Sequence, residues 1–379
     1  MKENKLFIRN VGFITISSTG GFILSLTGLS IGWMIGTLLI GALLSFWQPA
    51  SLKLPINQKG IPPYWLRIGQ CMLAIELGQK INLSVLHIFK EDWMTIIVML
   101  FLSIMFSVLS GFILWKFSQT DMLTSFFGTA PGGLTAMPGI AEEVGANTAV
   151  VSIIQTMRVF LVVLTIPMIV SSWLANPADY TLTSHSASAG IPEFEIVQLF
   201  WTAVLALAAW GGYYIGKYLK LPAPWLVGGM LGVASVQTLG SSYVGYDLIA
   251  WWPRSVMILS QIFIASSIGS RFHKNMLTGL KKTIFVALLS TLGLIFAMFV
   301  CAFFVSKATG ITFVTAALAF APGGIAEMAT TSAVLHADST FVVAVQVLRI
   351  MIVCIILPPL FRFLNRRELH KNMHSHVST

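Results

Sequence analysis

Two Ala-Pro-Gly-Gly motifs interrupt otherwise apolar stretches of the sequence, one in each half of the chain. Proline removes a backbone amide donor, and paired glycines let the chain turn and let a ligand approach closely. In a membrane protein such a break must be buried or line a water-filled cavity, and a helix starting after it points free amides, which favour anions, at that cavity. We interpret the motifs as a ligand site; the alternative is a device for close helix packing. They comprise Ala130, Pro131, Gly132, Gly133, Ala321, Pro322, Gly323 and Gly324.

A glutamine and an arginine follow each motif at a fixed spacing. Gln155 and Arg158 are three residues apart, as are Gln346 and Arg349, so each pair shares one face of a helix. A charge inside a membrane segment is costly, and it therefore faces the protein interior and marks a functional site. We interpret the arginines as groups that bind an anion or pair with a carboxylate. The alternative is a structural arginine that bonds to backbone carbonyls.

Glu327 is an acidic residue without an acidic counterpart in the other half of the chain. It follows Gly324 closely, and the equivalent residue after the first motif is Ala136. A lone carboxylate in a membrane segment can carry a proton or bind a cation. It could instead only neutralise Arg349 or Arg158. We favour the coupling role.

An internal repeat relates these two groups of residues. The motifs are offset by 322 − 131 = 191 residues, and the same offset maps Gln70 onto Gln261 and Lys80 onto Arg271. A single offset held across most of each half is a duplication. The sequence thus predicts membrane repeat 1 at 6–175, an external linker at 176–195, membrane repeat 2 at 196–365 and a cytoplasmic basic tail at 366–379.

The distribution of basic residues predicts how the repeats cross the membrane. The N-terminus and the tail are basic, whereas the chain between Arg158 and Lys217 has no Lys or Arg, so the termini should be cytoplasmic and the linker external. Each repeat then crosses an odd number of times. The interrupted segments 121–144 and 311–335 are the best candidates for entering and leaving on one side. We expect an all-α polytopic membrane protein of two inverted-topology repeats, each with about five crossings plus a broken or re-entrant segment.

The composition supports a membrane protein and excludes several other classes. Hydrophobic residues make up 56% of the 379 residues and charged residues only 10%, against about 25% charged in soluble domains. The net charge of +9 fits basic cytoplasmic loops, and no nucleic-acid partner is expected. The three cysteines and His336 lack the spacing of a metal site, so we expect no metal and no cofactor.

Longer sequence motifs include the two Ala-Pro-Gly-Gly breaks and one segment between them. P-x-P-W-L-x-G-G-M-L-G spans residues 222–232, and A-P-G-G-x-x-x-M occurs at residues 130–137 and 321–328, each followed by Q-x-x-R. With these motifs the chain resembles the AbrB duplication family of bacterial inner-membrane proteins over nearly its whole length. In the first repeat, Trp33 keeps W-x-x-G without the preceding prolines. The resemblance implies kinship with the cation-proton antiporter and anion transporter group, whose inverted repeats carry broken helices. Members carry labels such as AbrB-type transcriptional regulator and ammonia monooxygenase.

The function we expect is secondary transport of a small anionic or zwitterionic solute, coupled to a proton or cation, at the paired motifs. The expected partners are the lipid bilayer, the solute and the coupling ion; a homodimer is left open. We expect a multi-pass protein of the bacterial inner membrane and no enzyme activity. The alternative is a membrane sensor that affects gene expression through a partner protein. A membrane monooxygenase is less favoured, because a copper site needs clustered histidines.

Overall fold

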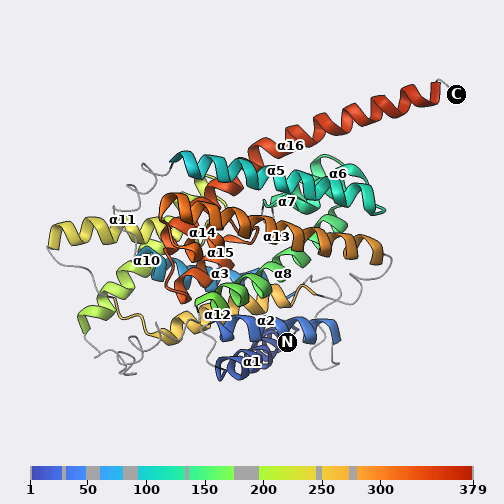
Figure 1. Ribbon diagram of the computed structural model, residues 1–379. Helices are drawn as coiled ribbons and strands as arrows, with labels where there is room; N and C mark the ends of the chain where they lie inside the picture. Colours follow the sequence, from blue (N-terminus) through green and yellow to red (C-terminus); the bar gives the residue numbers. More distant parts are fainter. Residues whose placement is uncertain are drawn as a thin grey trace. The chain divides into compact units, whose positions relative to one another are not determined.

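The described part of the structure, a computed structural model, is built of helices. It covers residues 2–27, 31–47, 60–79, 93–132, 136–174, 196–244, 250–272 and 280–377, and within these ranges no β-strand occurs (Figure 1). The expected all-α class is confirmed. The predicted external linker 176–195, Gly133, and Lys80 of the offset alignment lie outside the described residues.

Six helices of the described residues are long and apolar enough to cross a bilayer. Several carry bulky apolar side chains on their outer faces: Phe101 is 66% exposed and Phe296 is 72% exposed. A helix that is apolar around most of its circumference needs an apolar environment, which the lipid chains provide. The chain is therefore an all-α polytopic membrane protein. The six helices are α1 (Lys2–Ser25), α5 (Trp93–Phe117), α8 (Thr148–Leu174), α10 (Ile196–Tyr218), α13 (Lys281–Thr309) and α16 (Ser339–Val377).

The chain forms two compact units, and each unit takes helices from both halves of the sequence. The first contains α1, α10, the end of α8 and the start of α16, with α2 (Gly32–Trp47), α3 (Pro63–Gly78), α11 (Val227–Val244), α12 (Arg254–Gly269) and α15 (Ile325–Val334). The second contains α5, α13 and most of α8 and α16, with α6 (Met122–Thr129), α7 (Ala136–Glu143) and α14 (Phe313–Phe320).

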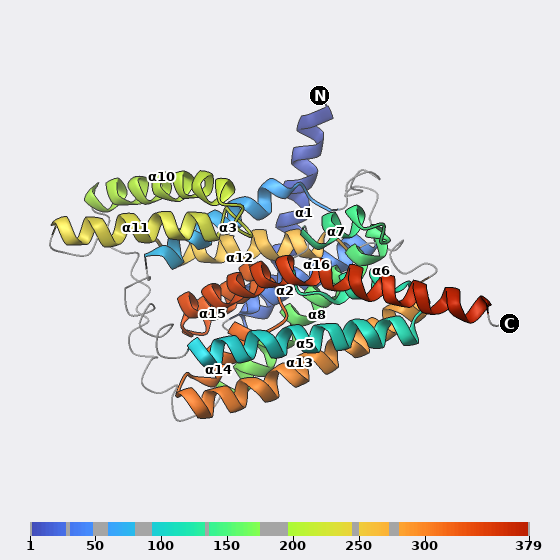
Figure 2. The same ribbon diagram turned by 90° about the horizontal axis from the view of Figure 1, so that it is seen from above.

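Glycines bring helix backbones close together in the first unit. A Cβ on Gly36 of α2 would collide with the carbonyl oxygen of Gly20 in α1, and a Cβ on Gly212 of α10 would collide with that of Gly228 in α11. Lipid chains are as apolar as the helices, so close van der Waals packing of small residues holds such helices together. Helix α1 lies beside α2, and α10 lies beside α11, as Figure 2 shows for the second pair.

The helix bounds follow the offset found in the sequence. The starts of α3 and α12 differ by 254 − 63 = 191 residues and their ends by 269 − 78 = 191. The starts of α6 and α14 differ by 313 − 122 = 191 and their ends by 320 − 129 = 191. Helices α3 and α12 also contact each other, because the hydroxyl of Ser260 donates to the carbonyl of Gly69 at 2.8 Å. Two helices of one half thus have counterparts of the same length in the other half, at the offset found in the sequence.

The second unit is built around the broken helices. Helix α6 packs on α16, where the ring of Phe361 lies 5.0 Å from that of Phe126 and 5.1 Å from that of Phe127. Helices α5 and α13 are joined by a hydrogen bond of 2.7 Å between the hydroxyls of Ser110 and Ser290. These contacts position the motif that follows α6 beside the helices that carry the glutamine–arginine pairs.

Candidate functional site

Both motifs break a helix, as the sequence predicts. Helix α6 ends at Thr129, and Ala130 is extended with φ −64° and ψ 128°. Helix α14 ends at Phe320, Ala321 is extended with φ −54° and ψ 137°, and α15 begins directly after Gly324. The half-helices before the breaks begin with matching caps, because the side chains of Asp121 and Thr312 accept from amides in the first turns of α6 and α14. Pro131, Gly132, Pro322 and Gly323 are buried, and Gly324 is half-buried.

The two glutamines cap the ends of the half-helices. The Nε2 of Gln155 donates to the carbonyl of Phe127 at 2.8 Å and to that of Ala130 at 3.1 Å. Gln346 donates to the equivalent carbonyls, 191 residues further on, at 2.9 and 3.1 Å. The last carbonyls of a helix have no partner within the helix, and buried ones need another donor. Each fully buried glutamine supplies one.

The arginines donate to carbonyls at the same breaks. The Nη1 of Arg158 donates to the carbonyl of Thr129 at 2.7 Å. Arg349 donates through Nη1 to the carbonyl of Ala321 and through Nη2 to that of Gly323 at 3.0 Å. These contacts are those of an arginine that stabilises the backbone, which was one of the two interpretations from the sequence. In both arginines the Nε has no hydrogen-bond partner among the described residues.

The two buried charges lie near each other in the second unit. Arg158 is 3% exposed and Arg349 is 1% exposed, and Arg158 acts electrostatically on Arg349. Among the described residues of this unit, no carboxylate acts electrostatically on either guanidinium. A buried charge needs a partner of opposite sign or strong hydrogen bonds. Among the described residues, backbone carbonyls and an amide oxygen are therefore the groups that stabilise the positive charge of the site.

The two breaks also differ in the hydrogen bonding of the glutamine oxygens. The Oε1 of Gln346 accepts from the Nη2 of Arg349 at 2.5 Å, whereas the Oε1 of Gln155 has no hydrogen-bond partner among the described residues. Gln155 is fully buried, so this oxygen is an acceptor inside the protein that no described residue satisfies. The first break thus has an unused acceptor and an unused guanidinium donor, the Nε of Arg158.

Glu327 lies in the first unit, in the first turn of α15, where it is 5% exposed. Its carboxylate accepts a hydrogen bond from its own backbone amide, and a negative charge is stabilised at a helix N-terminus. Its charged neighbour within the unit is Arg271, just beyond the end of α12: burial lowers the pKa of Arg271, and the carboxylate of Glu327 raises it. The sequence alone did not predict that these two residues interact. The one signal for Arg271 was its alignment with the basic Lys80.

Two glutamines related by the offset lie within helices of the first unit. Gln261 is buried within α12, and Gln70 is half-buried within α3, both in the first unit. Glu142 at the end of α7 is exposed. Among the described residues, no three His, Cys, Asp or Glu side chains lie together as a metal site would require.

The family model for "Transition state regulatory protein AbrB" matches residues 14–365, nearly the whole chain. This chain belongs to the AbrB family. Its relatives include the protein YhjN of Bacillus subtilis (strain 168), which is 52% identical over 366 residues, covering 96% of this chain and 95% of YhjN. A protein of Escherichia coli (strain K12) named "Putative regulator AbrB" is 26% identical over 332 residues, covering 88% of this chain and 89% of its own. The family assignment made from the sequence motifs is confirmed.

Proposed function

We propose that this AbrB-family protein is a secondary transporter of a small anionic or zwitterionic solute. The observation that carries the proposal is the pair of buried guanidiniums, Arg158 and Arg349, at two helix breaks, on which no carboxylate acts among the described residues of their unit. An anionic group would supply the missing negative charge. Broken helices near buried charges are the usual binding-site architecture of secondary transporters.

The unused polar atoms indicate how the solute binds. The Nε of each arginine would donate to a carboxylate or phosphate of the solute, a charge-assisted hydrogen bond stronger than one between neutral groups. The free Oε1 of Gln155 would accept from an ammonium or hydroxyl group of the same solute. The breaks hold these atoms in place, since the Nη1 of Arg158 and both Nη atoms of Arg349 are bonded to backbone carbonyls.

Glu327 is the proposed coupling residue. Its carboxylate is buried and interacts with Arg271, so protonation or binding of a cation would remove the negative charge that holds this arginine. The change would alternate with solute binding, and movement of the broken helices against the remaining helices would expose the site to either side. Two inverted-topology repeats of about five crossings each would give the required symmetry.

The test of coupling is solute flux in proteoliposomes under an imposed pH or sodium gradient, with small organic acids and amino-acid-like compounds as solutes. We expect gradient-driven uptake by the unaltered protein. Glu327→Gln should retain solute exchange in the absence of a gradient but lose accumulation against it. The matched control is Glu142→Gln, since Glu142 is exposed at the end of α7. Accumulation by Glu327→Gln equal to that of the control would contradict the coupling role.

A second candidate is a membrane sensor that acts on gene expression through a partner protein. The name "Putative regulator AbrB" of the Escherichia coli relative and the description of the family model favour it. The sensor would use the same anion site without transport. Saturable solute binding by folded protein, without flux for any bound solute and with capture of a soluble partner, would support the sensor over the transporter.

We further propose that the protein resides in the bacterial inner membrane with both termini in the cytoplasm. The support is the bacterial origin of the two relatives and the basic residues near both ends of the chain.

A further inference from the structure

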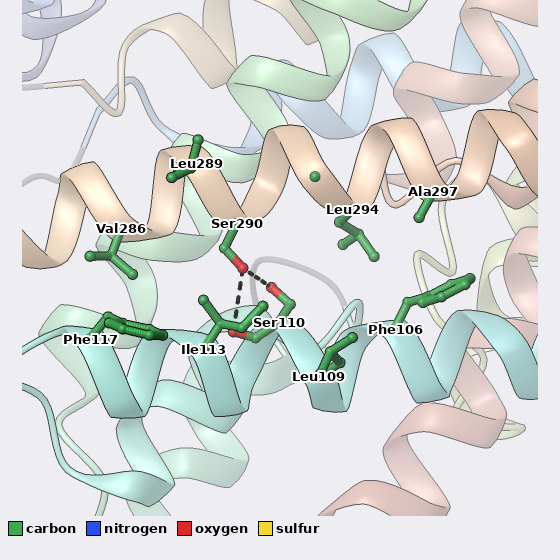
Figure 3. A pocket seen from close by; sticks show the side chains of 11 residues that line it. Phe106, Leu109, Ser110, Ile113, Phe117, Val286, Leu289, Ser290, Leu294 and Ala297 are labelled. Atoms are coloured by element: carbon green, nitrogen blue, oxygen red, sulfur yellow. Dashed lines mark hydrogen bonds between the residues drawn. The ribbon is translucent and has the colours of Figure 1, made fainter.

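Helices α5 and α13 of the second unit line an apolar groove of about 550 Å³ (Figure 3). Ser110 and Ser290 are its polar lining residues, and they are bonded to each other. The groove is open beside Gly293, where an added Cβ would have no atom within 4 Å. Phe117 and Val286 lie at one end of it, and Phe106 and Ala297 lie at the other.

Exposed lysines stand at the end of the groove marked by Phe117 and Val286. Lys282 precedes Val286 by four residues, so both lie on one face of α13. Lys116 follows Ile113, another lining residue, by three residues on α5. Lys281 is the first residue of α13. The groove is thus apolar along its length and basic at one end.

We propose that this groove binds one acyl chain of an anionic phospholipid, with the phosphate of the headgroup on Lys116, Lys281 and Lys282. A groove of this composition gives a polar solute no bonding partner, whereas an acyl chain fills it with apolar contacts. Lysines near the ends of membrane helices lie at the level of the headgroups, and basic clusters beside transmembrane helices bind anionic headgroups.

The charges favour a lipid over a second copy of the chain as the occupant. In a two-fold symmetric dimer the same patch faces itself, so a contact across the groove would gather the same lysines from both copies. Like charges brought together across an interface are unfavourable. An anionic lipid has the opposite charge and is present at high concentration in the bilayer.

The test is titration of the detergent-solubilised full chain with phosphatidylglycerol or phosphatidylcholine, followed by native mass spectrometry. The unaltered protein should bind phosphatidylglycerol more tightly. Reversing two charges in Lys116→Glu/Lys282→Glu should weaken phosphatidylglycerol binding by about tenfold or more and leave phosphatidylcholine binding unchanged. Lys307→Glu is the control, because Lys307 lies toward the opposite end of α13, over the ring of Phe303.

A second variant tests the groove itself. Gly293→Leu puts a side chain into the open space and raises helix propensity, so it should fold and weaken the binding of both lipids. Gly211→Leu is its control, since Gly211 of α10 also has open space around an added Cβ. Equal binding of the two lipids by the unaltered protein, or unchanged binding by both variants, would overturn the proposal. A change of oligomeric state in Gly293→Leu with unchanged lipid binding would also overturn it, in favour of a contact between copies.

Discussion

At the scale of the residue, the breaks and the buried arginines stabilise each other. A break in a helix leaves carbonyls without intrahelical partners, and a buried guanidinium needs several acceptors. Arg349 donates to the carbonyls of Ala321 and Gly323, and Gln346 donates to the carbonyls of Leu318 and Ala321. This mutual requirement explains why Gln-x-x-Arg accompanies Ala-Pro-Gly-Gly in both halves of the chain.

The two glutamines should differ in their contribution to stability. Gln346→Leu removes a donor to two carbonyls and also the acceptor of an Arg349 hydrogen bond, whereas Gln155→Leu removes only the donor. An additional buried unsatisfied group costs about 1–3 kcal/mol. We therefore expect Gln346→Leu to lower the free energy of unfolding in detergent by about 1–3 kcal/mol more than Gln155→Leu does. Equal losses would contradict the asymmetry between the two breaks.

Some residue roles followed from the sequence and others did not. Asn147 and Asp338 each precede an apolar run, a position where such side chains cap a helix, and in the structure they accept from the amides of Val150 and Phe341. The atoms that Arg349 would bond to were not predictable, because they depend on where the end of α14 lies in space. The interaction of Glu327 with Arg271 was missed for the same reason.

At the scale of the element, proline and glycine predicted most clearly where the helices break. The breaks after α6 and α14 fall at the predicted motifs, because proline lacks an amide donor and the glycines allow the turn. The close pairing of α1 with α2 and of α10 with α11 could not be located from the sequence alone. Glycines occur on many helix faces, and only the packing shows which of them meet a neighbouring backbone.

The glycines that meet a neighbouring backbone should be intolerant of even one methyl group. Gly36→Ala places a Cβ against the carbonyl oxygen of Gly20, so the helices must separate, at a cost of about 1–3 kcal/mol. Gly211→Ala, in open space, should instead stabilise its helix by up to about 1 kcal/mol. Thermal unfolding in detergent measures both changes. A midpoint of Gly36→Ala equal to or above that of Gly211→Ala would contradict the packing of α1 on α2.

At the scale of the whole molecule, the boundary between the two halves of the sequence does not coincide with the boundary between the two compact units. The offset of 191 residues identifies equivalent helices, but each unit combines helices from both halves of the chain. An offset shows which segments share a structure, whereas packing partners depend on which faces fit together. The repeat ranges 6–175 and 196–365 therefore stay a prediction from the sequence.

The proposed inverted topology makes a prediction about the two sides of the membrane. A cysteine introduced in the linker at Ser184 should react with an impermeant thiol reagent from outside intact cells, and one introduced at Ser375 should react only after permeabilisation. Cys71, Cys301 and Cys354 would first be replaced by alanine. Labelling of both positions from the same side would contradict an odd number of crossings in the second repeat.

The most direct test of the central claim is anion binding and flux in arginine variants. Arg349→Gln and Arg158→Gln remove one buried charge each, Arg349→Lys keeps the charge, and Arg254→Gln is the control because Arg254 is exposed. All would be compared in proteoliposomes after size-exclusion chromatography shows folded protein. We predict that the glutamine variants lose solute binding and flux, that the lysine variant keeps a measurable part, and that the control matches the unaltered protein. Folded Arg158→Gln and Arg349→Gln proteins with unchanged binding and flux would contradict an anion site at the breaks.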